Sequence, residues 1–176
     1  GASHLILDIP VGPTMKIQHF KDAEIIANKF QYLADKFHIT VVTDVNEMRE
    51  NAGRGVGPVL EARDVMQVLE QHPDRPLALE AKALRLAGKL LTICLENSKK
   101  SSHMSGEELA KKMLLSGDAL QKMREIIGAQ GGNPKIQSTD LVLAKHKYDI
   151  LSPHSGRVVH IDNKELTIIC RILGCP

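Results

Sequence analysis

The first forty residues alternate between apolar and polar stretches in an order that predicts a strand, a helix and a second strand. The apolar run at residues 5–9 is typical of a buried strand, and two prolines and a glycine in residues 10–14 end it. Residues 20–37 place apolar side chains at helical spacing, and a short β-branched run at residues 39–43 follows. This order predicts a parallel pair of strands joined by a right-handed crossover.

The helix and the strand ends also make predictions about individual residues. Phe20, Phe30 and Phe37 fall on the apolar face of the helix and are expected in the core. Ligands of parallel sheets gather outside the carboxyl ends of the strands, which the pattern places at residues 10–16 and from Asp44 onward. Lys16, just past the first strand, is the best single candidate for contacting an anionic substrate, although most lysines are simply solvated.

A glycine-rich stretch at residues 51–57 precedes Pro58 and a second set of apolar residues at helical spacing up to Leu69. Glycine allows backbone turns that a Cβ would forbid, and proline is favoured at the first position of a helix. The stretch therefore predicts a loop that leads into a helix. Such a loop can bind an ion through backbone groups or can be only a tight turn, and spacing alone favours the tight turn.

Helical patterns dominate the middle of the chain. Leucines at helical spacing predict one long, mostly buried helix, in which Cys94 is a small core residue. Serine, glycine and aspartate then mark the ends of two shorter helices. The expected segments are a helix over residues 77–95, a solvated connection at residues 99–103, a helix from Ser105 to residues 116–117, and a helix capped by Asp118 that runs through Ile127.

Turn-forming residues fill positions 128–134, and the character of the chain changes after them. Short apolar and β-branched runs follow, as in strands, whereas residues 164–173 could form a helix or a buried strand. We therefore expect an α/β fold in which residues 1–145 form part of a central mixed or parallel sheet flanked by helices. Residues 146–176 are expected to begin a small β-rich C-terminal domain. The predicted strands are residues 141–144, 148–151 and 157–161.

The composition of the chain mainly excludes classes of protein and kinds of site. The chain has 176 residues, a net charge of +2 and 3% aromatic residues, which argues against nucleic-acid binding as its main role. Three cysteines without CxxC spacing favour a reducing cytoplasm, and no segment resembles a membrane span or a signal peptide. The eight histidines are scattered and neither a GxSxG nor a P-loop motif is present, so the residues alone assign no catalytic group.

Five blocks of sequence carry a resemblance that spacing alone does not reveal. They are LILDIPVGPTMKI at residues 5–17, GRGVGPVLEARDVMQVL at residues 53–69, LLSGDAL at residues 114–120, AQGG at residues 129–132 and SPHSGRVVHIDNKEL at residues 152–166. In this order they resemble the thymidine phosphorylase family of nucleoside phosphorylases. The first block is most similar to the archaeal-type AMP phosphorylase branch of that family.

The resemblance implies an enzyme that cleaves the N-glycosidic bond of a nucleoside or nucleotide, with inorganic phosphate as co-substrate and no required cofactor. The family's phosphate loop and the residues that hold the base lie upstream of the first block. The chain is therefore expected to be a fragment that holds no catalytic residue and is inactive alone. Its expected partners are the nucleoside or nucleotide, phosphate and the remaining part of the same polypeptide, with the full-length protein a homodimer.

Two alternatives from other classes remain open. One is a non-catalytic scaffold or binding module that retained the phosphorylase fold. The other is a relative of the anthranilate-type phosphoribosyltransferases, which would use a pyrophosphate-bearing sugar and Mg²⁺. That second class lacks blocks such as DIPVGPTMK and SPHSG, which are present here.

The resemblance also implies a substrate-binding turn after the first strand. Bacterial relatives place an aromatic residue of the base pocket where this chain has Lys16. A cation there suits a nucleotide phosphate or a polarised base better than a stacked base. Thr14 and Met15 are expected to lie alongside it.

A potassium or calcium site is the second implication of the resemblance. Family members form it from two loop carbonyls and one carboxylate, which match Ala52, Gly55 and Asp64 here. Carbonyl and carboxylate oxygens suit a hard cation. Residues 50–53 depart from the family pattern, so the alternative that Asp64 only caps or solvates its helix stays open.

Overall fold

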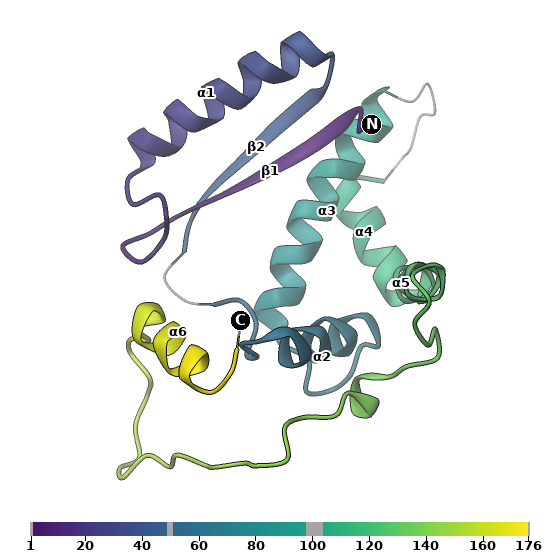
Figure 1. Ribbon diagram of the computed structural model, residues 1–176. Helices are drawn as coiled ribbons and strands as arrows, with labels where there is room; N and C mark the ends of the chain where they lie inside the picture. The colour runs from purple at the N-terminus through teal and green to yellow at the C-terminus, as the bar shows by residue number, and fades with distance from the viewer. Residues whose placement is uncertain (1, 49–50, 98–103, 176) are drawn as a thin grey trace.

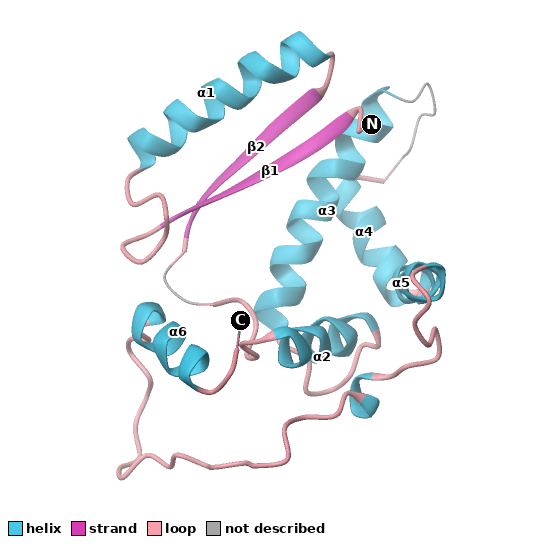
Figure 2. Ribbon diagram, in the orientation of Figure 1, coloured by secondary structure: helices cyan, strands magenta, loops and turns pink. Residues whose placement is uncertain are grey.

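The computed structural model describes residues 2–48, 51–97 and 104–175. The predicted connection at residues 99–103 and Glu50 of the glycine-rich region lie outside the described residues. In these ranges the chain is a mixed α/β structure of two strands and six α-helices, none of which is both long and apolar enough to cross a membrane (Figure 1, Figure 2). The elements are β1 (His4–Val11), α1 (Phe20–Phe37), β2 (Thr40–Glu47), α2 (Pro58–Leu69), α3 (Leu77–Asn97), α4 (Gly106–Leu115), α5 (Asp118–Ala129), the 3-10 turn η1 (Ser138–Asp140) and α6 (Asn163–Ile172).

The predicted strand, helix and strand are confirmed, and β1 and β2 pair in parallel from His4 with Thr40 to Val11 with Glu47. On the face of the sheet toward α1, Ile9 and Val11 pack against Ala23 of that helix and form a small apolar core. Figure 1 shows α1 and α3 on opposite sides of the two strands, so the other sheet face is covered by α3.

Both strands extend beyond the predicted limits. β1 continues through Pro10 to Val11, and β2 continues through Asp44 to Glu47. Proline is tolerated in β1 because an edge strand can spare one backbone N–H, and Asp44 is tolerated in β2 because two cations of α3 neutralise it. The carboxyl ends of the strands therefore lie later than the sequence pattern predicts.

The starts of α2 and α4 are confirmed, but the predicted cap of α5 is wrong. At α4, the N–H of Glu108 donates to Ser105 Oγ over 3.2 Å and the N–H of Ser105 donates to Glu108 Oε2 over 2.7 Å, which is a complete capping box. The N-cap of α5 is Gly117 in a left-handed conformation, with φ of 84°. Asp118 is instead the first residue of the helix, where its charge favours the N-terminal end of the helix dipole.

The predicted core positions on α1 and α3 are also corrected. Phe20, Phe30 and Phe37 are 54%, 40% and 70% exposed, because α1 turns its small residues rather than its phenylalanines toward the sheet. Ala23 and Ala34 are the buried residues of that helix. The long helix α3 is confirmed but is less buried than predicted, and Cys94 is exposed.

No β-rich domain is seen in the described C-terminal residues. None of the three predicted strands between residues 141 and 161 is formed, and side chains such as Tyr148 and Val159 are each 88% exposed. A strand needs a neighbour to pair its backbone groups, and no described segment supplies one here. The undecided segment after Lys164 is helical and belongs to α6. The domain boundary near Lys145 stays a prediction.

Helices α3 and α4 cross in close contact at two glycines. A Cβ on Gly88 would lie 2.9 Å from Glu107 Cα, and a Cβ on Gly106 would lie 2.1 Å from the Gly88 carbonyl oxygen and 2.6 Å from the Thr92 nitrogen. Both positions therefore require glycine, since real Cβ atoms do not approach backbone atoms this closely. The crossing fixes α4, and through it α5, on α3.

Replacing Gly106 with alanine is expected to lower the free energy of unfolding by about 2 kcal/mol, because the new Cβ collides with backbone atoms of α3. Urea unfolding followed by circular dichroism measures this change. Gly156→Ala is the matched control, because no atom lies within 4 Å of a Cβ added there. Equal midpoints for the two variants would contradict the close crossing.

Candidate functional site

The turn that follows β1 is held closed by backbone hydrogen bonds. The N–H of Gly12 donates to the Ile17 carbonyl over 3.1 Å, and the N–H of Met15 donates to the Gly12 carbonyl over 3.0 Å. A Cβ on Gly12 would lie 2.3 Å from the carbonyl oxygen of Met48, so glycine alone lets the turn lie against the end of β2. Residues 14–16 are thereby presented beyond the carboxyl ends of the strands.

A cavity of about 410 Å³ opens beside this turn. It lies between the turn, the glycine-rich loop and α6. Figure 1 shows α6 below the carboxyl ends of the strands. Thr14 and Met15 both line it, whereas Lys16 is exposed and lies outside its lining. Parallel sheets bind ligands at this position. The substrate-binding roles of Thr14, Met15 and Lys16 stay predictions.

Helix α6 forms much of the opposite wall, and sequence reasoning did not identify it as part of a site. Asp162 caps the helix: the N–H groups of Glu165 and Lys164 donate to its carboxylate and hold the pKa of Asp162 below its ordinary value. The spacing of Asp162 and Glu165 is typical of a helix start and was the available signal. No pattern in the sequence shows that this helix returns to the loop after β1.

Asn163, the first residue of α6, is the most informative side chain of this wall. It is 9% exposed, and both polar atoms of its amide are buried without a hydrogen-bond partner in the described part of the chain. A buried amide without partners carries a desolvation cost that a polar ligand or a water can remove. Lys164 and Arg171 also line the cavity and make its wall positive.

The glycine-rich loop is organised around the carboxylate of Asp64. This side chain is 2% exposed, and its Oδ2 accepts hydrogen bonds from the N–H groups of Arg54, over 2.6 Å, and Gly55, over 2.7 Å. The N–H of Gly57 donates to Glu61 Oε1 over 2.9 Å and closes the loop onto the helix. The two carboxylates therefore hold the loop through backbone donors.

This geometry bears on the predicted cation site. The loop turns N–H groups, rather than carbonyls, toward the Asp64 oxygen that it contacts, and that oxygen is satisfied without an ion. Asp64 thus has a structural role without an ion, but this role differs from the predicted capping or solvation of its helix, because the buried carboxylate holds the preceding loop. The cation site of Ala52, Gly55 and Asp64 stays a prediction. Among the described residues, no three His, Cys, Asp or Glu side chains gather in a group that could hold a metal ion.

A second polar cluster lies between the sheet and α3. Asp8 and Asp44 face each other across the parallel strands, and the Nδ2 of Asn46 donates to Asp8 Oδ1 over 2.7 Å and to Asp44 Oδ2 over 3.1 Å. Arg85 and Lys89 of α3 form ion pairs with Asp44. The sequence pattern did not reveal this cluster, because its members are brought together from three elements.

The charge state of Asp44 follows from these partners. Burial raises the pKa of Asp44, but the hydrogen bonds and charges of Lys89 and Arg85 more than offset it and hold that pKa below its ordinary value. Asp44 is therefore a carboxylate near neutral pH and is poorly suited to donate a proton. Its role in this structure is to bind α3 to the sheet.

An α/β structure with a polar, positively lined cavity beyond its strand ends is typical of proteins that bind small molecules. No protein-family model matches the chain. A protein of Albidiferax ferrireducens named "Putative thymidine phosphorylase" is 40% identical over 176 residues, which are 100% of this chain and 33% of that protein. A protein of Methylococcus capsulatus with the same name is also 40% identical, with the same coverage.

The AMP phosphorylase of Methanosarcina barkeri is 37% identical over 176 residues, which are 100% of this chain and 34% of that protein. The chain thus spans about a third of the length of the relatives it matches. It belongs to the thymidine phosphorylase family, as a segment of that length.

Asp44→Asn is expected to lower the free energy of unfolding by about 2 kcal/mol at pH 7, because Arg85 and Lys89 lose their charged partner. The loss is moderate because the side chains of both cations are partly exposed to solvent. The native pKa of Asp44 is lowered, so its contribution is present above the unfolded pKa of about 3.9 and is lost as the pH falls through the native value.

Urea unfolding of the parent and the variant from pH 7 to pH 3 measures both effects. The stability difference should stay constant down to about pH 5 and should shrink below about pH 4. Asp74→Asn, at an exposed loop position, is the matched control and should leave stability unchanged. A difference that does not depend on pH would contradict the assigned role of the Asp44 charge.

Proposed function

We propose that the chain is part of a phosphorylase that cleaves the N-glycosidic bond of a nucleoside or a nucleoside monophosphate. The observation that carries this proposal is homology along the whole chain to proteins named thymidine phosphorylase and AMP phosphorylase. The cavity beyond the strand ends supports it, because the turn that lines it carries the end of the block DIPVGPTMK. Inorganic phosphate is the second substrate, and the reaction needs no further cofactor.

In this reaction an oxygen of phosphate forms a bond to C1 of the sugar while the bond from C1 to the base nitrogen breaks. The base leaves with the electron pair of that bond and takes up a proton. Such a reaction needs phosphate and sugar held in line, and donors placed where charge develops on the departing base. The groups that hold phosphate are expected in the remaining part of the polypeptide, so this segment alone is inactive.

The segment contributes the strand-end wall of the substrate site. Lys16 is exposed on the turn next to Thr14 and Met15, and no aromatic residue occupies this turn. A cation at this place favours a substrate with a phosphate group, as in a nucleoside monophosphate, because charge-assisted hydrogen bonds to phosphate are strong. The buried amide of Asn163 and the cations of α6 add polar contacts on the other side of the cavity.

A phosphate-dependence assay on the complete polypeptide tests the reaction class. AMP, CMP, UMP, thymidine and uridine are each incubated with and without inorganic phosphate, and release of free base is measured. Base should appear only with phosphate, together with a sugar phosphate. Release without phosphate would refute phosphorolysis, and transfer that requires Mg²⁺ and a pyrophosphate-bearing sugar would identify a phosphoribosyltransferase. Complete inactivity with every substrate would favour a scaffold.

Lys16→Ala in the complete polypeptide is expected to raise KM for the preferred nucleotide about tenfold, because one charge-assisted contact to phosphate is lost. KM for the corresponding nucleoside, which has no phosphate, should change much less. Lys29→Ala, which removes an exposed lysine of α1, is the matched control. An unchanged KM for nucleotide in Lys16→Ala would remove this residue from the substrate site.

A further inference from the structure

A second cleft lies on the opposite part of the molecule from the strand ends, between α5 and the segment that leads into η1. Its volume is about 540 Å³, within the range of small-molecule sites. Arg124, Gln121 and Glu125 line it from α5, and Lys135 and Gln137 line it from the segment before η1. Neither the motifs of the family resemblance nor the strand-end cavity includes these five side chains.

The wall opposite α5 is fixed by hydrogen bonds to α2. Glu70, the C-cap of α2, accepts from the N–H of Ser138 over 2.9 Å and from Ser138 Oγ over 2.6 Å, and Ser138 is 2% exposed. The beginning of the same segment is tied to α5, because the N–H of Gly132 donates to the Ile127 carbonyl over 2.9 Å. Both sides of the cleft are thus held in place before any ligand binds.

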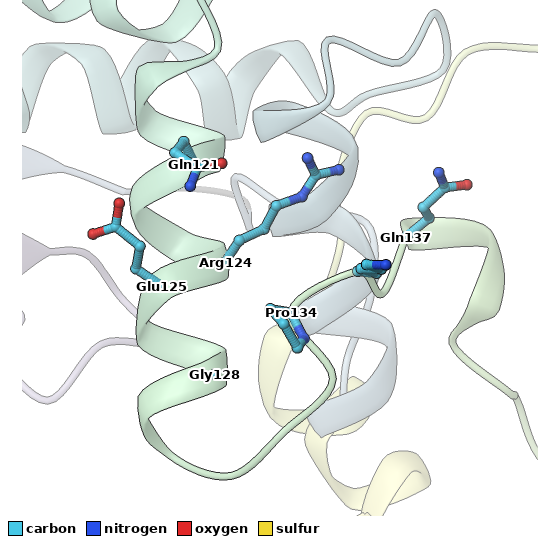
Figure 3. A pocket seen from close by; sticks show the side chains of 7 residues that line it. Gln121, Arg124, Glu125, Gly128, Pro134 and Gln137 are labelled. Carbon is cyan, nitrogen blue, oxygen red and sulfur yellow. The ribbon is translucent and has the colours of Figure 1, made fainter.

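Arg124 is the central group of the cleft. Figure 3 shows its side chain extending from α5 toward the segment that carries Pro134 and Gln137. The Nε atom of Arg124 is buried and has no hydrogen-bond partner among the described residues. A buried N–H group without a partner carries a desolvation cost, and an anion placed against it removes that cost.

The charges around Arg124 favour an anion rather than a cation. Lys135 adds a second positive charge to the lining. The acidic residue of the lining, Glu125, forms an ion pair with Lys122, and Figure 3 shows its carboxylate pointing away from Arg124. Gln121 and Gln137 supply amide groups that can donate hydrogen bonds to oxygen atoms.

We propose that this cleft binds the phosphate group of a small molecule, with Arg124 and Lys135 as its charged contacts. Arginine suits a phosphate because its planar fork of donors matches two of the oxygens. The cleft is larger than one phosphate ion, so it also accommodates the organic part of a phosphate ester. The site is separate from the strand-end cavity and does not depend on the proposed phosphorolysis.

The experiment follows the Nε–H signal of Arg124 in the complete polypeptide by NMR during a titration with inorganic phosphate at constant ionic strength. Arg124→Gln identifies the signal by its loss. The signal should shift and saturate, and Lys135→Gln should weaken binding about tenfold, because one charge-assisted hydrogen bond is removed. Lys135 is exposed on its loop, so this variant is expected to fold normally. Lys112→Gln, an exposed lysine on α4, is the matched control and should bind as the parent does.

Parallel titrations with ribose 5-phosphate, AMP and acetate identify the ligand chemistry. Saturation by phosphate or by either ester supports the proposal. The compound with the highest affinity then identifies the kind of molecule that carries the phosphate group. A signal that does not move, a shift produced equally by acetate, or equal affinities in Lys135→Gln and Lys112→Gln would overturn it. Because the readout is the Arg124 signal, phosphate bound elsewhere in the polypeptide does not produce a false positive.

Discussion

The pairing of two aspartates across parallel strands is the interaction on which this structure depends. Asp8 and Asp44 lie at the same register of β1 and β2, where like charges repel each other. The repulsion is removed by Lys82, which lies 2.7 Å from Asp8, and by the ion pairs of Asp44 with two cations of α3. The sheet therefore holds α3 by charge on one face, while it holds α1 by apolar contact on the other. Since α4 crosses α3 at Gly88 and α5 follows α4, the helical side of the molecule rests on this electrostatic contact.

Local chemistry made much of the fold predictable from the sequence. The alternation of apolar runs predicted β1, α1 and β2, Pro58 predicted the start of α2, and Ser105 predicted the start of α4. The errors arose where distant parts of the chain decide the outcome. Asp44 looked like the end of a strand, because no local pattern shows that α3 brings two cations to it. The phenylalanines of α1 looked like core residues, but the sheet contacts Ala23 and Ala34 instead. The apolar runs after residue 140 looked like strands, but strands form only where a partner is present.

In the candidate site, too, local sequence predicted some residues, whereas contacts between distant parts of the chain were missed. The resemblance of the first block directed attention to Thr14, Met15 and Lys16, and two of these line the strand-end cavity. The opposite wall was missed because α6 follows a long stretch without regular structure, and helical periodicity does not say where a helix packs. Asn163 could be recognised only from its environment, since an asparagine near a helix start is usually a solvated or capping residue.

The manner in which α6 is attached has a mechanical consequence for the cavity. Residues 142–162 are exposed throughout and form no regular secondary structure before the helix begins, so they act as a tether rather than as a wall. Beyond the other end of α6, a Cβ on Gly57 would lie 3.3 Å from Cys175 Sγ, which places Cys175 against the start of α2. The α6 wall of the cavity is therefore positioned by the contacts of the helix itself and of the residues after it, rather than by the segment that precedes it.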